Sequence, residues 1–159
     1  MKTGPIKYFF TLLCISSLGF GCCGPKNARS GQPVKQGISG FVGELTGNQM
    51  PGPGRPAQQP KGVSTVVYVY ESTKMSEVEQ SSDGPFFRTI RTKLVDSVVS
   101  DSAGRFQLAL PAGSYSVFVR TEGQLYANSF DAQQTIAPAV VQKNRVTEVN
   151  ITISANASF

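Results

Sequence analysis

The sequence contains no histidine and no tryptophan, and its three cysteines all lie within the first 23 of its 159 residues. Without histidine there is no Ser–His or Cys–His pair for nucleophilic catalysis, no His-ligated metal and no ordinary proton shuttle at neutral pH. Without cysteine beyond residue 23, the rest of the chain has no internal disulfide, so its core must hold it together alone. We therefore expect no catalytic residues, no metal site and no cofactor.

Charge is scarce as well, because charged residues make up only 16% of the chain. Leaving out Lys2 and Lys7, which belong to the N-terminal segment discussed next, 13 basic residues stand against 10 acidic ones. No run of Lys and Arg exceeds two neighbours, so the chain lacks the basic patch of a nucleic-acid-binding protein. An apolar share of 40% is enough for a core, and 16 Gly with 10 Pro favour a turn-rich β protein.

Residues 1–21 predict a signal peptide. Lys2 and Lys7 form a short positive region before an apolar run, residues 8–20 (YFFTLLCISSLGF), that is too short to span a bilayer as a helix. The run ends in LGFGC (18–22), which resembles a bacterial lipobox, although Phe20 stands where a small residue is usual. The resemblance implies that Cys22 carries diacylglycerol and becomes the acylated N-terminus, and several acyl chains anchor a protein stably. An ordinary secretory signal cleaved near Gly21 is the alternative.

The remainder of the chain divides into a tether and one domain. Residues 22–36 are polar and rich in Gly, Pro and Lys, which is typical of a flexible tether. Residues 37–156 contain about seven short runs of β-branched, aromatic and alternating residues separated by turn residues, and no convincing amphipathic helix. This pattern predicts a β-sandwich.

Two neighbouring segments show the clearest alternation. Residues 105–110 place Phe106 on an apolar face, and residues 114–119 do the same with Tyr115, so we expect both aromatic rings in the core. Pro111 and Gly113 lie between the two segments, which predicts a hairpin with Gly113 at a positive φ and the two rings paired across it.

A turn is predicted just before these segments, at residues 101–104 (DSAG). Asp101 stands first, where its carboxylate can accept a hydrogen bond from the backbone N–H two residues on, and Gly104 stands last. Asp101 could also be a calcium ligand, but the Asp-x-Asp-x-Asp-Gly spacing of a calcium loop is missing.

The same residues carry a resemblance to a known family. Residues 100–106 (SDSAGRF), residues 110–117 (LPAGSYSV) and the opening run at 37–42 (GISGFV) resemble the carboxypeptidase-regulatory-like domain. The resemblance covers roughly residues 37–153 and implies a seven-stranded Greek-key β-sandwich of the transthyretin-like or immunoglobulin-like type. The motifs are structural and imply no catalysis. With its long insertion between the first two strands, the chain also resembles small lipoproteins of Bacteroidota.

Tyr68 and Tyr70 are the candidate binding residues. They alternate with Val67 and Val69 in the most β-rich run of the chain. If the valines face the core, the tyrosines face outward, where their rings could stack on a sugar or a peptide. The alternative is that they cover a sheet edge or pack under the long loops.

Together these features predict a non-enzymatic cell-envelope lipoprotein whose domain is a structural or protein-interaction module. We expect it to be anchored by lipid to a membrane, with the periplasmic face of the outer membrane favoured, and to meet an envelope protein or glycan there. A carbohydrate-binding module is the second reading. The third, a transthyretin-like hydrolase of the hydroxyisourate type, is disfavoured because that site is built with histidines.

Overall fold

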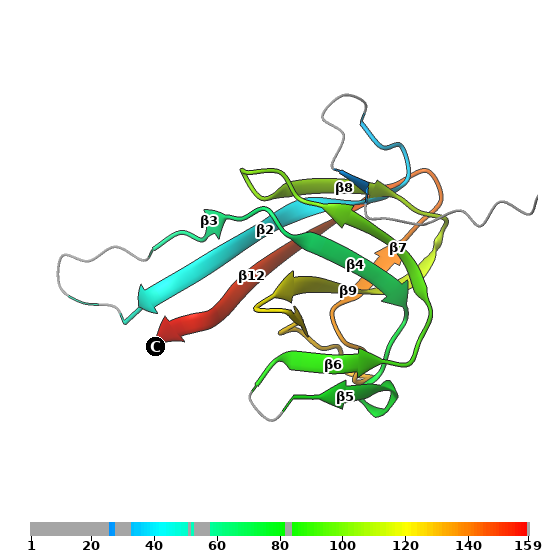
Figure 1. Cartoon of the computed structure of the whole chain (residues 1–159). Helices are drawn as coiled ribbons and strands as arrows, with labels where there is room; N and C mark the ends of the chain where they lie inside the picture. The colour runs from blue at the N-terminus through cyan, green and yellow to red at the C-terminus, as the bar shows by residue number, and fades with distance from the viewer. Residues whose placement is uncertain (1–25, 28–32, 51, 53–57, 82–83, 159) are drawn as a thin grey trace, which may run out of the picture.

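The computed structural model describes residues 26–27, 33–50, 52, 58–81 and 84–158, with 26–27 described for the backbone alone (Figure 1). The expected signal peptide, Cys22 and much of the expected tether lie outside the described residues. Within these residues the regular structure is made of strands and one short 3-10 helix, η1 (Met75–Glu77). No helix of the described part is long and apolar enough to cross a membrane.

The strands form two sheets that pack against each other (Figure 1), which confirms the expected all-β sandwich. The larger sheet has eight strands in the order β1-β7-β4-β9-β10-β6-β5, with β11 also paired to β9. The smaller sheet has four strands in the order β12-β2-β3, with β8 also paired to β2. The strands of the larger sheet are β1 (Lys26–Asn27), β4 (Val66–Glu71), β5 (Val78–Gln80), β6 (Phe86–Ile90), β7 (Leu94–Val99), β9 (Gly113–Thr121), β10 (Gln124–Tyr126) and β11 (Pro138–Val141). Those of the smaller sheet are β2 (Gly37–Asn48), β3 (Lys61–Gly62), β8 (Arg105–Ala109) and β12 (Val146–Ser158).

The described part of the chain contains more strands than the seven expected. The apolar run at 86–99 is divided between β6 and β7, and β1 and β3 are only 2 residues long. Pieces this short have little hydrophobic pattern of their own, because period-two alternation needs four or more residues to be recognised. Their pairing is set by neighbouring strands.

β2 is the strand around which the smaller sheet is built. Along one edge, residues 37–41 pair antiparallel with β8, and residues 43–44 pair with β3. Along its other edge, β2 pairs in parallel with β12 over its whole length. β12 is the last strand of this sheet, so its second edge pairs with no strand among the described residues.

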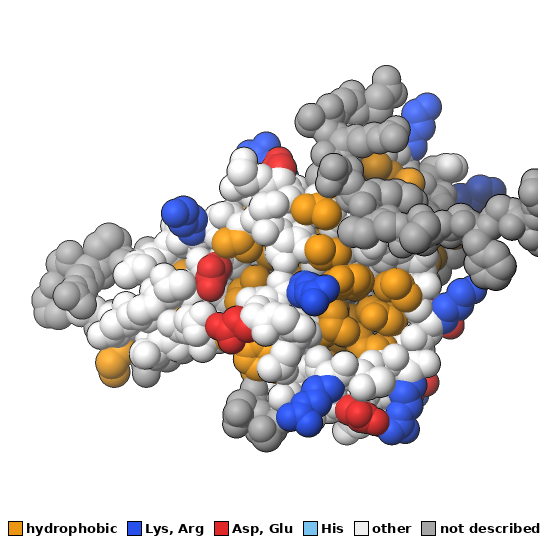
Figure 2. Space-filling model, in the orientation of Figure 1, with side chains coloured by type: hydrophobic (Ala, Val, Ile, Leu, Met, Phe, Trp, Pro, Cys, Tyr) orange, Lys and Arg blue, Asp and Glu red, His pale blue; other side chains and the backbone are white. Residues whose placement is uncertain are grey.

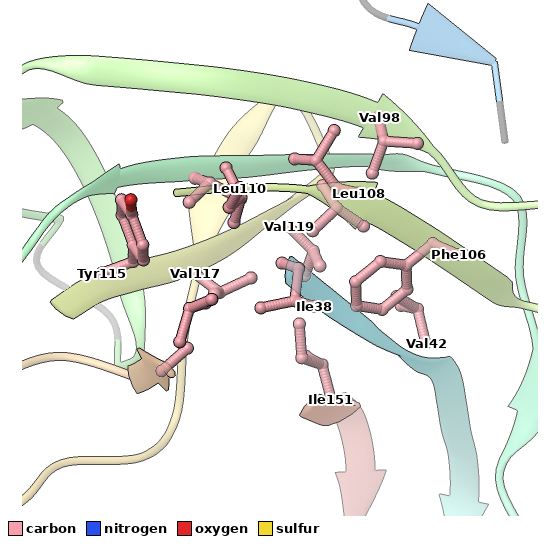
Figure 3. Close-up of a cluster of buried hydrophobic side chains, with 14 of the residues drawn as sticks. Ile38, Val42, Val98, Phe106, Leu108, Leu110, Tyr115, Val117, Val119 and Ile151 are labelled. Carbon is pink, nitrogen blue, oxygen red and sulfur yellow. The ribbon is translucent and has the colours of Figure 1, made fainter. Parts of the chain in front are cut away.

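Alternating apolar side chains from both sheets form the main core (Figure 3). Val67 and Val69 of β4 are fully buried, whereas Tyr68 and Tyr70 are partly exposed on the opposite face, as the alternation predicts. The buried members of this core are Ile38, Val42, Val67, Val69, Val98, Phe106, Leu108, Leu110, Tyr115, Val117, Val119, Tyr126, Ala139, Val141, Ile151 and Ile153.

The predicted hairpin between residues 105–110 and 114–119 is wrong. β8 pairs with β2 in the smaller sheet, and β9 pairs with β4 in the larger one, so Pro111 and Gly113 belong to a loop that crosses between sheets. Alternation shows that a strand is half-buried, but it does not show which strand is its partner. Phe106 and Tyr115 are both buried, at 4% and 8% exposure, and they enter the core from opposite sheets instead of pairing across one hairpin.

The prediction that Gly113 has a positive φ is also wrong. A glycine is favoured there for another reason, which is the space that Tyr115 needs. The Tyr115 ring folds back over the loop, and its hydroxyl donates a hydrogen bond to the Pro111 carbonyl at 3.0 Å. A Cβ on Gly113 would lie 3.1 Å from that hydroxyl oxygen. Glycine therefore leaves room for the tyrosine that closes the crossing.

A second apolar cluster lies on the opposite face of the larger sheet. Phe118 of β9 points away from the main core and yet is fully buried. Its ring makes edge-to-face contacts with Tyr70 and Phe87, with both pairs of ring centroids 5.6 Å apart. Met75, Val78 and residues of the 127–137 segment belong to the same cluster. The outer face of the larger sheet is therefore only partly open to solvent.

Candidate functional site

The open part of that outer face is hollowed beside the two predicted tyrosines. Tyr68 and Tyr70 of β4 line a hollow of about 250 Å³ together with Arg120 of β9 and Leu125 of β10. β9 lies next to β4 and β10 lies next to β9, so the sheet order brings together residues that are far apart in sequence. Gly123 and Gln124, in the turn and strand after β9, complete the lining.

Apolar side chains surround this part of the sheet. Figure 2 shows them gathered over the larger sheet, with a basic side chain among them. Leu94, which pairs with Tyr70 in the neighbouring strand, is 45% exposed. An apolar area of this kind with polar neighbours is typical of interaction surfaces.

The polar groups of the hollow are ready to make hydrogen bonds. Burial, and secondarily the neighbouring Tyr68, raises the pKa of Tyr70 above its usual value, so its phenol remains a neutral donor at pH 7. The Arg120 guanidinium has no ion pair within the described part of the chain. Gln124 alternates with Leu125 along β10, so its side chain, whose oxygen is buried, lies toward the inner face of the sheet and does not belong to these groups.

These groups can bind a ligand. Tyrosine rings offer flat apolar faces, and arginine offers a permanent cation with several N–H donors. The described residues contain no cluster of three or more His, Cys, Asp or Glu side chains that could hold a metal ion.

Tyr68 and Tyr70 differ in how their rings pack. Tyr70 packs against Phe118 with the ring planes at 88°, so it belongs to the second apolar cluster as well as to the hollow. Tyr68 belongs to neither cluster. Both rings therefore lie on the face opposite the valines, and Tyr70 also packs against Phe118 of the neighbouring strand.

The only pair of acidic residues close in sequence, Glu77 and Glu79, makes structural contacts. The Glu77 carboxylate accepts a hydrogen bond from the backbone N–H of Lys74 at 2.9 Å and so caps η1. The Glu79 carboxylate lies 3.5 Å from the Arg91 guanidinium, in an exposed ion pair of little energetic weight.

Asp101 lies in the turn that the sequence predicts. Its Oδ1 atom accepts hydrogen bonds from the backbone N–H groups of Ala103 at 2.9 Å and Arg105 at 2.8 Å. Its carbonyl accepts a bond from the Gly104 N–H at 2.9 Å, and Gly104 has φ +79°. The carboxylate is therefore directed to the backbone of its own turn.

A second copy of this turn occurs at Asp131, where sequence reasoning missed it. Its Oδ1 accepts bonds from the N–H groups of Gln133 at 2.9 Å and Thr135 at 2.8 Å, the same offsets as at Asp101. Gln134 occupies the place of Gly104, with φ +62°. The hydrogen bond from Thr135 is the main reason why the pKa of Asp131 lies below its usual value. Without a glycine at the fourth place, the sequence gives only the aspartate as a sign of this turn.

Comparison with known proteins adds no relative. No family model, no curated protein and no solved structure matches the chain. The resemblance to the carboxypeptidase-regulatory-like domain accordingly stays a prediction from the motifs at 37–42, 100–106 and 110–117.

Proposed function

We propose that the chain is a lipid-anchored cell-envelope protein whose β-sandwich is a non-catalytic structural or protein-interaction module. The observation that carries the second half of this proposal is the apolar hollow beside Tyr68 and Arg120 on the outer face of the larger sheet. A solvated face of an antiparallel sheet is usually polar, because only its inner face needs to be apolar. Apolar rings beside a cation that has no ion pair among the described residues favour a partner that covers them.

The anchor is proposed on the sequence before the domain. The apolar run ends in LGFGC (18–22), with Cys22 last, and the smaller sheet of the described domain begins with β2 at Gly37. Acyl chains on Cys22 would keep the domain within a tether's length of a membrane, for which we favour the periplasmic face of the outer membrane. Each acyl CH₂ buried in the bilayer contributes about 0.8 kcal/mol, so several chains make the attachment stable.

Palmitate labelling tests the anchor. The full chain should incorporate labelled palmitate in a bacterial host, and Cys22→Ala should abolish the label. Cys23→Ala is the matched control, because it removes the adjacent thiol and should leave the label in place. Label retained on Cys22→Ala would defeat this half of the proposal.

Photo-crosslinking in native membranes tests the interaction surface. A crosslinking amino acid at Tyr68 should give a discrete adduct with an envelope protein, because this side chain lines the hollow. The same amino acid at Ser102, in the exposed turn after Asp101, is the control and should give none. Equal adducts at both positions, or none at Tyr68, would count against the hollow as the contact surface.

A carbohydrate ligand is the second candidate for the same hollow. The observation that favours it is the Arg120 guanidinium beside the rings of Tyr68 and Tyr70. Sugar hydroxyls can accept hydrogen bonds from a guanidinium while the sugar ring lies on a tyrosine. Affinity electrophoresis in gels containing glycans should then show retardation that Tyr68→Ala removes. Tyr68 is the better residue to change, because Tyr70 also supports Phe118.

A further inference from the structure

The second edge of β12 offers a binding site of a different kind. The Gly37 N–H donates to the Arg145 carbonyl at 3.1 Å, at the start of the parallel pairing of β2 with β12. Because backbone groups alternate in direction along a strand, odd-numbered residues from Thr147 to Ile153 turn their N–H and C=O groups toward β2. The even-numbered residues turn theirs toward the open edge.

Part of that edge is already closed by side chains. The Thr152 carbonyl accepts hydrogen bonds from the Tyr126 hydroxyl at 3.3 Å and from the Asn128 amide at 3.1 Å. The Ser154 N–H donates to the same Tyr126 hydroxyl at 3.1 Å. These side chains stand where a neighbouring strand would be, so β12 needs no strand partner at this end.

At Glu148 and Asn150, which precede Thr152 in β12, the edge is open. No strand or side chain of the described residues bonds to the outward backbone groups of Glu148 and Asn150. Beside them lies a groove of about 250 Å³ between β12 and the larger sheet. Its apolar lining includes Val117, Ala127 and Ala137, opposite Val149.

We propose that this edge binds an extended peptide segment of a partner protein, which adds a strand to the smaller sheet beside residues 146–150. The peptide backbone would bond to the outward groups of Glu148 and Asn150, as in β-strand addition at a sheet edge. Its side chains would alternate, with small apolar ones entering the groove and the others lying beside the Glu148 side chain.

The negative charge of Glu148 beside the groove favours a basic peptide. Glu148 is the only charged residue among those described that line the groove, and its side chain is exposed. It bonds to the Asn150 amide at 2.8 Å and has no ion pair within the described part of the chain. A Lys or Arg opposite Glu148 would make a favourable cross-strand pair, and an acidic residue there would be repelled.

The same charge disfavours a second copy of this chain as the occupant. Because the side chains of Tyr126 and Asn128 close the edge from Thr152 onward, a twofold-related copy would have to pair around Glu148. The two Glu148 carboxylates would then stand opposite each other, and like charges in that position are destabilising.

This proposal rests on the proposed role as an interaction module, and it gives that role a second surface that is independent of the anchor. Loss of palmitate labelling would leave it intact. Loss of the peptide site described next would leave the anchor and the hollow at Tyr68 intact.

Amide hydrogen exchange on the full chain provides the test. The probe is a short capped peptide of alternating Lys and Val at concentrations up to about 1 mM, which would detect even a weak complex. We expect the Glu148 and Asn150 amides to exchange fast in the free protein and to become protected with the peptide. The same peptide with N-methyl groups on the edge that faces β12 should give no protection.

Charge reversal makes the test specific. Glu148→Lys should weaken binding of the Lys–Val peptide at least several-fold and create binding of a Glu–Val peptide. Glu79→Lys, on exposed β5 of the other sheet, is the matched control and should change neither. No protection at Glu148 and Asn150, or equal binding of both peptides to the unchanged protein, would overturn the proposal. Protection that depends on protein concentration without peptide would overturn it in favour of a second copy.

Discussion

Replacing Gly104 by alanine, in comparison with Gly123, separates two contributions to the loss of stability. One is backbone strain at a positive φ, and the other is the lack of space for a Cβ atom. Gly104 has φ +79° in the Asp101 turn, and Gly123 has φ +80° in the turn between β9 and β10. An ideal Cβ on Gly123 would meet nothing within 4 Å. On Gly104 it would lie 2.2 Å from the Val42 carbonyl oxygen and 2.9 Å from the Gly62 Cα atom.

The expected magnitudes follow from this difference. A left-handed φ costs a non-glycine residue about 1–2 kcal/mol, and Gly104→Ala and Gly123→Ala share that cost. Only Gly104→Ala must also push the turn away from β2 and β3, which breaks the Val42 N–H bond to the Gly104 carbonyl, 2.8 Å long. One hydrogen bond and the disturbed contact beside it add about 2 kcal/mol. We therefore expect a loss of about 1 kcal/mol for Gly123→Ala and about 3 kcal/mol for Gly104→Ala.

Urea denaturation followed by circular dichroism measures the change in the free energy of unfolding for each variant of the full chain. Thermal melts give the corresponding melting temperatures. At about 4 °C per kcal/mol for a domain of this size, melting temperatures should fall by about 4 °C and about 12 °C. Gly84→Ala is a second control, because Gly84 has φ +76° and a Cβ there would meet no atom within 4 Å. Equal losses at Gly104 and Gly123 would refute the reasoning, because the two backbones are alike and only the space differs.

Four further substitutions test the turns and the core. Gln134→Gly should raise the free energy of unfolding by about 0.5–1 kcal/mol in urea denaturation, because it relieves a positive φ of +62°. Asp131→Asn should lower stability at neutral pH; since the folded-state pKa of Asp131 is depressed, that loss should shrink as pH falls through this pKa in an acid titration of stability. Tyr115→Phe should cost about 1 kcal/mol in thermal melts, because the ring stays and the 3.0 Å bond to the Pro111 carbonyl is lost. Phe106→Ala should cost about 3–5 kcal/mol in the same assay, because a ring that is 4% exposed leaves a cavity between the sheets.

What the sequence could predict depends on how local the responsible contacts are. The Asp101 turn was predictable because its hydrogen bonds span no more than four residues, between Asp101 and Arg105. The burial of Val67 and Val69 was predictable because alternation is a local pattern. The partner of β8 was not, because β2 lies far away in the sequence and the short Pro111–Gly113 loop suggested a hairpin.

The candidate site shows the same division. The sequence placed Tyr68 and Tyr70 on one face of a strand, but it could not place Arg120 and Leu125 beside them, since that requires the order of three strands. In the sequence, Phe118 is the residue that indicates the second apolar cluster. An aromatic residue on the polar face of an alternating strand implies that something covers it, and here residues of the 127–137 segment contribute to that cover.

The parallel pairing of β2 with β12 determines how the domain would carry a mechanical load. β2 begins at Gly37 and runs beside β12 until Asn48 lies opposite Ser158 (Figure 1). Once the two-residue pairing of β1 with β7 has opened, a pull from the N-terminal side acts along β2, so it loads the ladders to β12 and β8 in shear, with many hydrogen bonds resisting at once. Bonds at the end of a hairpin would instead open one after another. Such a pull is thus resisted along the 12 residues of β2 together.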